Sequence, residues 1–114
     1  IRENNNLHYD LYIGFPEAAL GSTKQIPTLN GKVKIKIEKG VQSGKILRLK
    51  DKGLPNIEGY GNGDLLIHIN LWTPQELTKE QITFFENQIE TNNMQPNPGK
   101  SDKSFFERVK DMFN

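Results

Sequence analysis

The dipeptide Asn30-Gly31 is the strongest local structural signal in the chain. Asn-Gly supplies the positive backbone φ angles of a two-residue type I′ turn with the least strain. After this turn Val33, Ile35 and Ile37 alternate with lysines, which is the period of a strand with one buried face. The sequence therefore predicts a β-hairpin whose first strand covers residues 23–29 and whose second strand begins at Lys32.

The three lysines of this second strand lie on one exposed face of the predicted hairpin. Lys32, Lys34 and Lys36 could form a solvated edge or a patch that binds a ligand. Lysine commonly protects edge strands from aggregation, so the pattern favours the solvated edge.

Three further segments alternate with a period of two. They cover residues 7–15, 45–50 and 64–71, and the glycine-rich stretch 53–63 between the last two is a predicted loop. After Pro16, residues 17–21 can form one helical turn closed by Gly21. Five strands with turns between them predict a mainly β fold, either a small β-sandwich or an open barrel, with C-terminal α-helices.

Beyond residues 73–74 the period lengthens to that of a helix. Thr78 and Gln81 form a predicted capping box, so a helix is expected from Lys79 to about Glu90. Its apolar residues, spread over more than one face, are Ile82, Phe84, Phe85 and Ile89.

The last part of the chain is predicted to be a tether followed by a second helix. Residues 91–100 are rich in asparagine and proline and are expected to be a linker. The apolar stripe of a docking helix then follows over residues 101–114, at Phe105, Phe106, Val109, Met112 and Phe113.

Composition limits the classes of function open to the chain. Its 114 residues suffice for one compact core, and a hydrophobic content of 34% predicts a thin one. A net charge of +1 argues against nucleic-acid binding, and the lack of cysteine excludes disulfides and thiolate zinc sites. No apolar run reaches the ~18 residues of a membrane span. We expect a cytoplasmic chain without a membrane anchor and, since it opens at Ile1, a piece of a longer protein.

No motif in the sequence predicts catalysis or metal binding. Residues 40–45 imitate a phosphate-binding loop, but Ile46 follows Lys45 and a strand begins where that motif requires a helix. His8 and His68 are interpreted as ordinary surface or rim histidines, because neither has a second ligand at metal-site spacing. We therefore expect a chain that is no enzyme and holds no metal or other cofactor.

Several medium-length motifs, in one order and register, resemble a known family. They are residues 10–12, 15–21, 26–33, 42–45, 52–55, 63–65 and 72–74. This pattern is similar to the second C-terminal β-domain of bacterial DnaJ, the forty-kilodalton heat-shock co-chaperone of the stress response. Asp51 departs from the family, which usually has glycine there, and Glu38 replaces a common proline.

The resemblance implies a co-chaperone segment without catalysis of its own. In the family a J-domain with a His-Pro-Asp motif stimulates the ATPase DnaK and a cysteine-rich module binds zinc, and neither sequence is present here. The segment's implied partners are a second copy of itself and unfolded client polypeptides. By similarity to the family's first β-domain, clients would contact Tyr9, Leu11, Ile13 and Ile26.

The resulting division of the chain has four parts. Residues 1–76 are the β-domain, 77–90 the dimerisation helix with Ile82, Phe84, Phe85 and Ile89, 91–100 the linker and 101–114 the apolar docking helix. Three points stay open: Phe84 could be a partly exposed neighbour of an intramolecular core, the last helix could dock on its own domain or on a partner, and client identity is not encoded. The alternatives to a chaperone segment are a β-sandwich that serves another assembly and an enzyme fragment.

Overall fold

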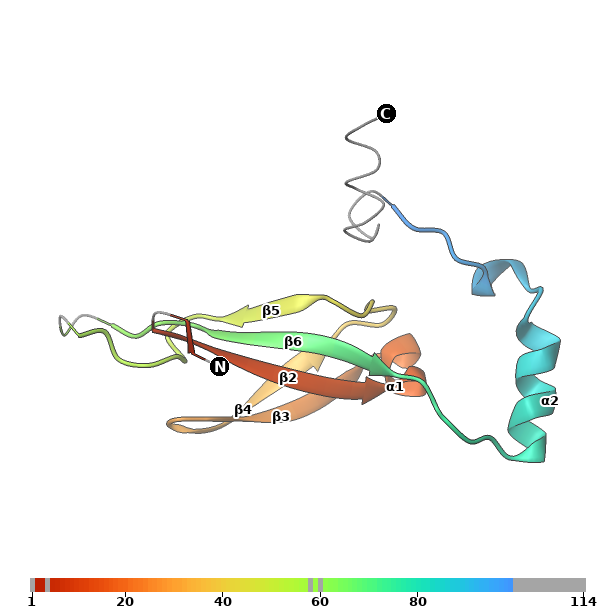
Figure 1. Ribbon diagram of the computed structural model, residues 1–114, viewed down its shortest axis with the longest axis horizontal. Coiled ribbons are helices and arrows are strands. Elements are labelled where there is room, and N and C mark those ends of the chain that lie inside the picture. The colour runs from red at the N-terminus through yellow and green to blue at the C-terminus, as the bar shows by residue number, and fades with distance from the viewer. Residues whose placement is uncertain (1, 4, 58, 60, 100–114) are drawn as a thin grey trace. The chain divides into compact units, whose positions relative to one another are not determined.

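The computed structural model describes residues 2–3, 5–57, 59 and 61–99 (Figure 1). The chain divides into two compact units, Ile1–Pro74 and Gln75–Asn114. The elements in chain order are β1 (Arg2–Glu3), β2 (Asn6–Gly14), α1 (Phe15–Leu20), β3 (Ser22–Thr28), β4 (Gly31–Ile37), β5 (Ile46–Leu49), β6 (Leu65–Trp72), α2 (Lys79–Gln88) and the 3-10 turn η1 (Asn92–Met94).

The first unit is a small β-sandwich, as the alternation predicted. One sheet has the order β1-β2-β6-β5, and the other consists of β3 and β4. Strands β2 and β6 are parallel from Leu7 beside Leu65 to Gly14 beside Trp72, while the other pairs are antiparallel. The predicted strand boundaries each differ from the observed ones by one residue, and no closed barrel forms among the described residues.

The predicted hairpin is present, but its turn type is wrong. Thr28 pairs with Gly31, so the two turn residues are Leu29 and Asn30. Among the described non-glycine residues only Asp51 has a positive φ, which rules out a type I′ turn. Gly31, with φ 115°, alone takes the unusual conformation as the first residue of β4. A glycine directly after the two turn residues can take the positive φ that the chain reversal requires. Asn30 therefore does not need a positive φ.

The core lies between the two sheets and is as thin as the composition predicted. It takes alternate residues of both layers together with one residue of α1: Ile13, Ala18, Ile26, Ile35, Ile37, Leu65, Ile67 and Ile69. Helix α1 follows β2 directly, begins with Phe15 and Pro16, and ends at Gly21, whose φ is 86°. This helix closes one end of the sandwich.

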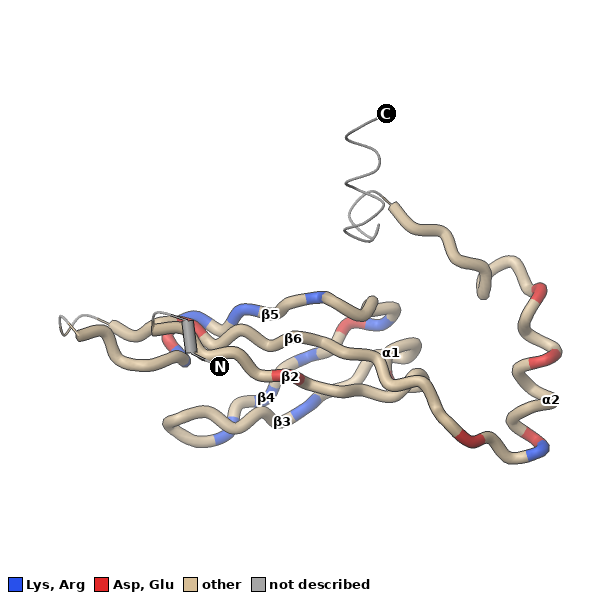
Figure 2. Tube along the Cα trace, in the orientation of Figure 1, with Lys and Arg blue, Asp and Glu red and all other residues tan. Residues whose placement is uncertain are grey.

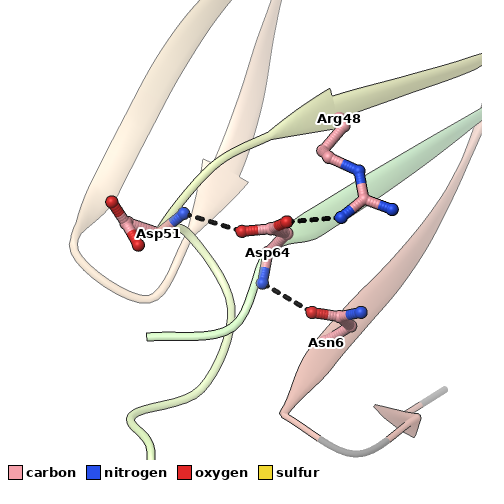
Figure 3. A network of polar contacts seen from close by, with 4 residues as sticks. All are labelled: Asn6, Arg48, Asp51 and Asp64. Carbon is pink, nitrogen blue, oxygen red and sulfur yellow. Dashed lines mark hydrogen bonds and ion pairs between the residues drawn. The ribbon is translucent and has the colours of Figure 1, made fainter. Parts of the chain in front are cut away.

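A polar network fastens the loop between β5 and β6 to the start of the sheet (Figure 3). Asp64 accepts hydrogen bonds from the Arg48 guanidinium at 2.6 Å and from the backbone N–H of Asp51 at 3.1 Å. Its own backbone N–H donates to the Asn6 side chain at 2.7 Å. Asp51 has φ 63°, so the backbone keeps the glycine-like conformation although the usual glycine is replaced.

The second unit is described through α2 and η1. Thr78 and Gln81 form the predicted capping box: Gln81 N–H donates to Thr78 Oγ1 at 3.2 Å, and Thr78 N–H donates to Gln81 Oε1 at 2.8 Å. The helix ends at Gln88, two residues before the predicted end at Glu90. In the described part of the chain, no helix is both long and apolar enough to cross a membrane.

Candidate functional site

The four residues expected to contact clients all belong to the inner side of the sandwich. Ile13 and Ile26 are buried, with 1% and 0% of their surfaces exposed. Tyr9 and Leu11 are half-buried and pack against the same core. The structure therefore leaves Tyr9 and Leu11 within reach of a ligand at the margin of the core and places Ile13 and Ile26 behind them.

Strand β2 has an open edge next to these residues. Strand β1 pairs only with Asn6 and Leu7, and from His8 onward β2 has β6 as its one partner within the described residues. An open edge presents unpaired backbone N–H and C=O groups to which an extended polypeptide can add as a further strand.

Two exposed aromatic residues lie on the outer face of the same strands. Tyr12 and Trp72 are 61% and 54% exposed, and their rings meet edge to face with centroids 6.3 Å apart. The sequence analysis missed this pair because it considered only the alternate residues of each strand that face the core. A large aromatic residue at a position that faces solvent was the signal that could have revealed it.

The predicted dimerisation residues are largely uncovered. Ile82, Phe84 and Ile89 are 44%, 56% and 69% exposed, and α2 has no buried residue. Phe85 is half-buried, and its ring meets that of Phe84 edge to face at 5.6 Å. At 100° per residue, Ile82, Phe85 and Ile89 share one side of the helix and Phe84 lies on the opposite side. Apolar side chains thus lie on two sides of α2, and most of them are exposed.

The predicted docking helix lies outside the described residues. Its stripe of Phe105, Phe106, Val109, Met112 and Phe113 stays a prediction.

The two units differ in the charged residues they carry. Figure 2 shows basic positions on β3 and β4, and acidic positions along α2. Lys32, Lys34 and Lys36 are all exposed on one face of β4, as the sequence predicted. Near α1, hydrogen bonds from Lys24 and Ser22 hold the pKa of Glu17 below its ordinary value. In the loop network, the Asp51 N–H and then Arg48 lower the pKa of Asp64 in the same way.

A hollow of about 430 Å³ lies where α1 meets the start of β3 and the end of β4. Its lining includes Leu20, Thr23, Lys36, Glu38 and Lys39. None of the predicted site residues lines it. The charged side chains at this hollow suit an apolar client less well than the margin of the core at Tyr9 and Leu11 does.

The described residues contain no group of three or more histidine, cysteine, aspartate or glutamate side chains placed to hold a metal ion. The polar contacts described above have structural roles. Those of Asp64 tie the loop between β5 and β6 to the sheet, and the Lys24–Glu17 ion pair fastens α1 to β3. The candidate site is thus a pair of surfaces, the open edge of β2 and the apolar faces of α2.

Comparison with known proteins gives matches along the whole chain. A model of the DnaJ C-terminal domain matches residues 1–74. The relative named Chaperone protein DnaJ from Salinibacter ruber is 47% identical over 115 residues, covering 99% of this chain and 30% of the relative. Proteins of the same name from Bacteroides thetaiotaomicron and Pelagibacter ubique are each 46% identical, over 100% and 96% of this chain. The chain spans about 30% of the length of these relatives.

Proposed function

Because this chain belongs to the DnaJ C-terminal domain family, we propose that it is a co-chaperone segment that forms homodimers and gives secondary binding to unfolded client polypeptides. The whole protein would act with DnaK through a J-domain and would hold zinc in a cysteine-rich module, both outside this sequence. This segment would contain neither of these two modules. The observation that carries the proposal is the set of uncovered apolar side chains on α2.

The argument for self-association starts from the two apolar faces of α2, because packing against its own chain can cover only one of them. A helix of ten residues is marginal in water unless it packs against something. Each large apolar side chain that becomes fully buried contributes about 1.5–3 kcal/mol. In a two-fold interface each such residue contributes twice to the binding free energy, because both protomers bury the same residues. Ile82, Phe84, Phe85 and Ile89 thus supply a seam suited to a dimer.

Self-association is tested by the solution mass of the chain over a concentration series, measured by sedimentation equilibrium. The wild-type chain is expected to be a dimer, and Phe84→Glu is expected to weaken it at least about a hundredfold, since two buried charges enter the seam. Thr83→Glu is the matched control. It adds the same charge on the polar side of the same helix and should leave the dimer intact.

Two outcomes would contradict the seam. One is a monomeric wild-type chain at the highest concentration, and the other is an unchanged dimer in Phe84→Glu. Circular dichroism shows whether each variant keeps its strands and helix, so loss of folding is distinguished from loss of the interface.

Client binding is proposed at the open edge of β2. An extended apolar segment would add beside β2 by main-chain hydrogen bonds, and its inward side chains would contact Tyr9 and Leu11. Ile13 and Ile26 would form the floor beneath this contact without being exposed to the client.

A fluorescent apolar heptapeptide provides the test, together with the same peptide N-methylated at alternate residues. Binding of the first and not of the second is expected, because N-methylation removes the main-chain donors. Leu11→Ala should weaken binding, whereas Leu47→Ala, a half-buried core-margin residue on β5, should not. Amide shifts that the peptide induces only in α2, or none at all, would remove this site.

A further inference from the structure

Two histidines from distant parts of the chain meet on the outer face of the larger sheet. His8 on β2 and His68 on β6 are 60 residues apart in the sequence. Their rings are stacked with centroids 5.0 Å apart, and Nδ1 of His8 lies 2.7 Å from Nε2 of His68. Both are half-buried, as rim histidines would be. Their contact differs from the sequence expectation, which gave neither histidine a second one nearby.

The parallel pairing of β2 and β6 produces this meeting. His8 lies beside Leu66, and His68 lies beside Asp10, two residues further along both strands. Because side chains alternate across a strand, all four residues share the outer face. On the other side of β6, Ile46 of β5 lies beside His68. Leu66 and Ile46 therefore give the two imidazoles an apolar border, and Asp10 places a carboxylate at the open side.

We propose that His8 and His68 form a two-histidine binding site for a divalent transition-metal ion of the class that prefers imidazole nitrogen, with zinc as its representative. A hydrogen bond between two ring nitrogens requires a lone pair of one to point at the other. The ring atoms that face each other across this gap are the atoms that ligate metals in proteins. Copper and nickel share this preference, whereas magnesium and calcium require oxygen ligands.

The change needed to admit the ion is small. At zinc–nitrogen distances of about 2.0–2.1 Å and a tetrahedral angle, two ligating nitrogens lie about 3.3 Å apart. The present separation is 2.7 Å, so the rings must part by roughly 0.6 Å, and both must turn so that their lone pairs point at the ion instead of at each other. The proton now shared between the rings moves to the other nitrogen of the ring that carries it. Both histidines then remain neutral, with His8 protonated at Nε2 and His68 at Nδ1, and water completes the coordination.

Bound metal would join the two central strands of the sheet. An ion that binds only the folded chain raises the melting temperature of the chain. Above the dissociation constant, the stabilisation grows with the logarithm of the ion concentration. The inference is independent of the client and dimer proposals. The pair lies on the outer face of the sheet in the first unit, whereas the dimer proposal rests on α2 of the second unit and the client proposal on Tyr9 and Leu11, which face the core.

The experiment titrates the untagged chain with zinc chloride in a buffer that does not chelate metals. Isothermal titration calorimetry should give one zinc ion per chain, and magnesium chloride under the same conditions should give none. Heteronuclear NMR should show shifts of the imidazole carbons of His8 and His68 on addition of zinc. The melting temperature should rise with zinc by several degrees at about a hundredfold excess over the dissociation constant.

Matched variants assign the ligands. His8→Gln and His68→Gln should each weaken zinc binding at least about tenfold and abolish the thermal shift, while circular dichroism confirms that they fold. Tyr12→Phe is the control on the same face of β2 and should bind zinc as the wild type does. Zinc binding that survives in both histidine variants, or its absence in the folded wild-type chain, would overturn the proposal. So would a stoichiometry of one ion per two chains with an increase in solution mass.

Discussion

Replacing Gly63 with alanine tests whether the loop between β5 and β6 is locked onto the sheet by a close backbone approach. A Cβ atom at Gly63 would lie 2.0 Å from the carbonyl oxygen of Asn5 and 2.3 Å from its carbonyl carbon. Contacts of this kind normally exceed about 3.4 Å, so the two backbone segments must separate by more than 1 Å. The φ angle of Gly63 is not positive, so the expected effect is steric and owes nothing to backbone strain.

The magnitude follows from the hydrogen bonds that depend on this approach. Gly63 N–H donates to Leu54 O at 2.7 Å, Gly53 N–H donates to Gly63 O at 2.8 Å, and Leu54 N–H donates to Asn5 O at 2.9 Å. At about 1 kcal/mol for each bond, Gly63→Ala should lower the free energy of unfolding by about 3 kcal/mol. With a urea m-value of about 1–1.5 kcal/mol per M for a domain of this size, the unfolding midpoint should fall by about 2–3 M.

Urea unfolding followed by the fluorescence of Trp72 and by circular dichroism measures this change. Gly14→Ala is the matched control, because a Cβ at Gly14 meets only Pro16 Cδ at 3.7 Å. Its φ of −75° suits any residue, so this variant should be as stable as the wild type or slightly more stable. A Gly63→Ala midpoint within about 0.3 M of the wild-type value would refute the steric argument.

Four further substitutions test separate parts of the fold. Ile67→Ala, at a side chain with 0% exposure, should cost about 2–5 kcal/mol of unfolding free energy in the same urea assay. Asp51→Gly should stabilise the first unit by about 0.5–1 kcal/mol, since glycine adopts φ 63° without strain; an unchanged or lower midpoint would contradict this. Asp64→Asn should lose stability relative to wild type at neutral pH and match it more closely below about pH 4, because a carboxylate with a lowered pKa contributes stability above its unfolded pKa and loses it as pH falls. Thr78→Ala should destabilise α2 by about 1 kcal/mol, seen as smaller helical Cα chemical shifts over 79–88, and unaltered shifts would argue against the capping box.

The helices and strands that depend on neighbouring residues could be predicted from the sequence. The alternation from Leu7 onward, the glycine at the end of α1 and the Thr78–Gln81 capping box each involve neighbours within a few residues, and the structure has all three. The hairpin around Asn30 was also readable. Its turn type was not, because the strand pairing decides which residues occupy the turn: pairing of Thr28 with Gly31 puts Leu29 and Asn30 there, and Asn30 has no positive φ.

Contacts between distant segments required the tertiary structure. The parallel pairing of β2 with β6 aligns residues 58 positions apart, and no local pattern encodes that register. This pairing brings His8 to His68 and Tyr12 to Trp72, two pairs whose members look isolated in the sequence. Burial behaves in the same way. Alternation identified the apolar side of β2, but only packing against the second sheet decided that Ile13 is enclosed while its neighbour Leu11 stays at the margin, because enclosure depends on what lies opposite each residue.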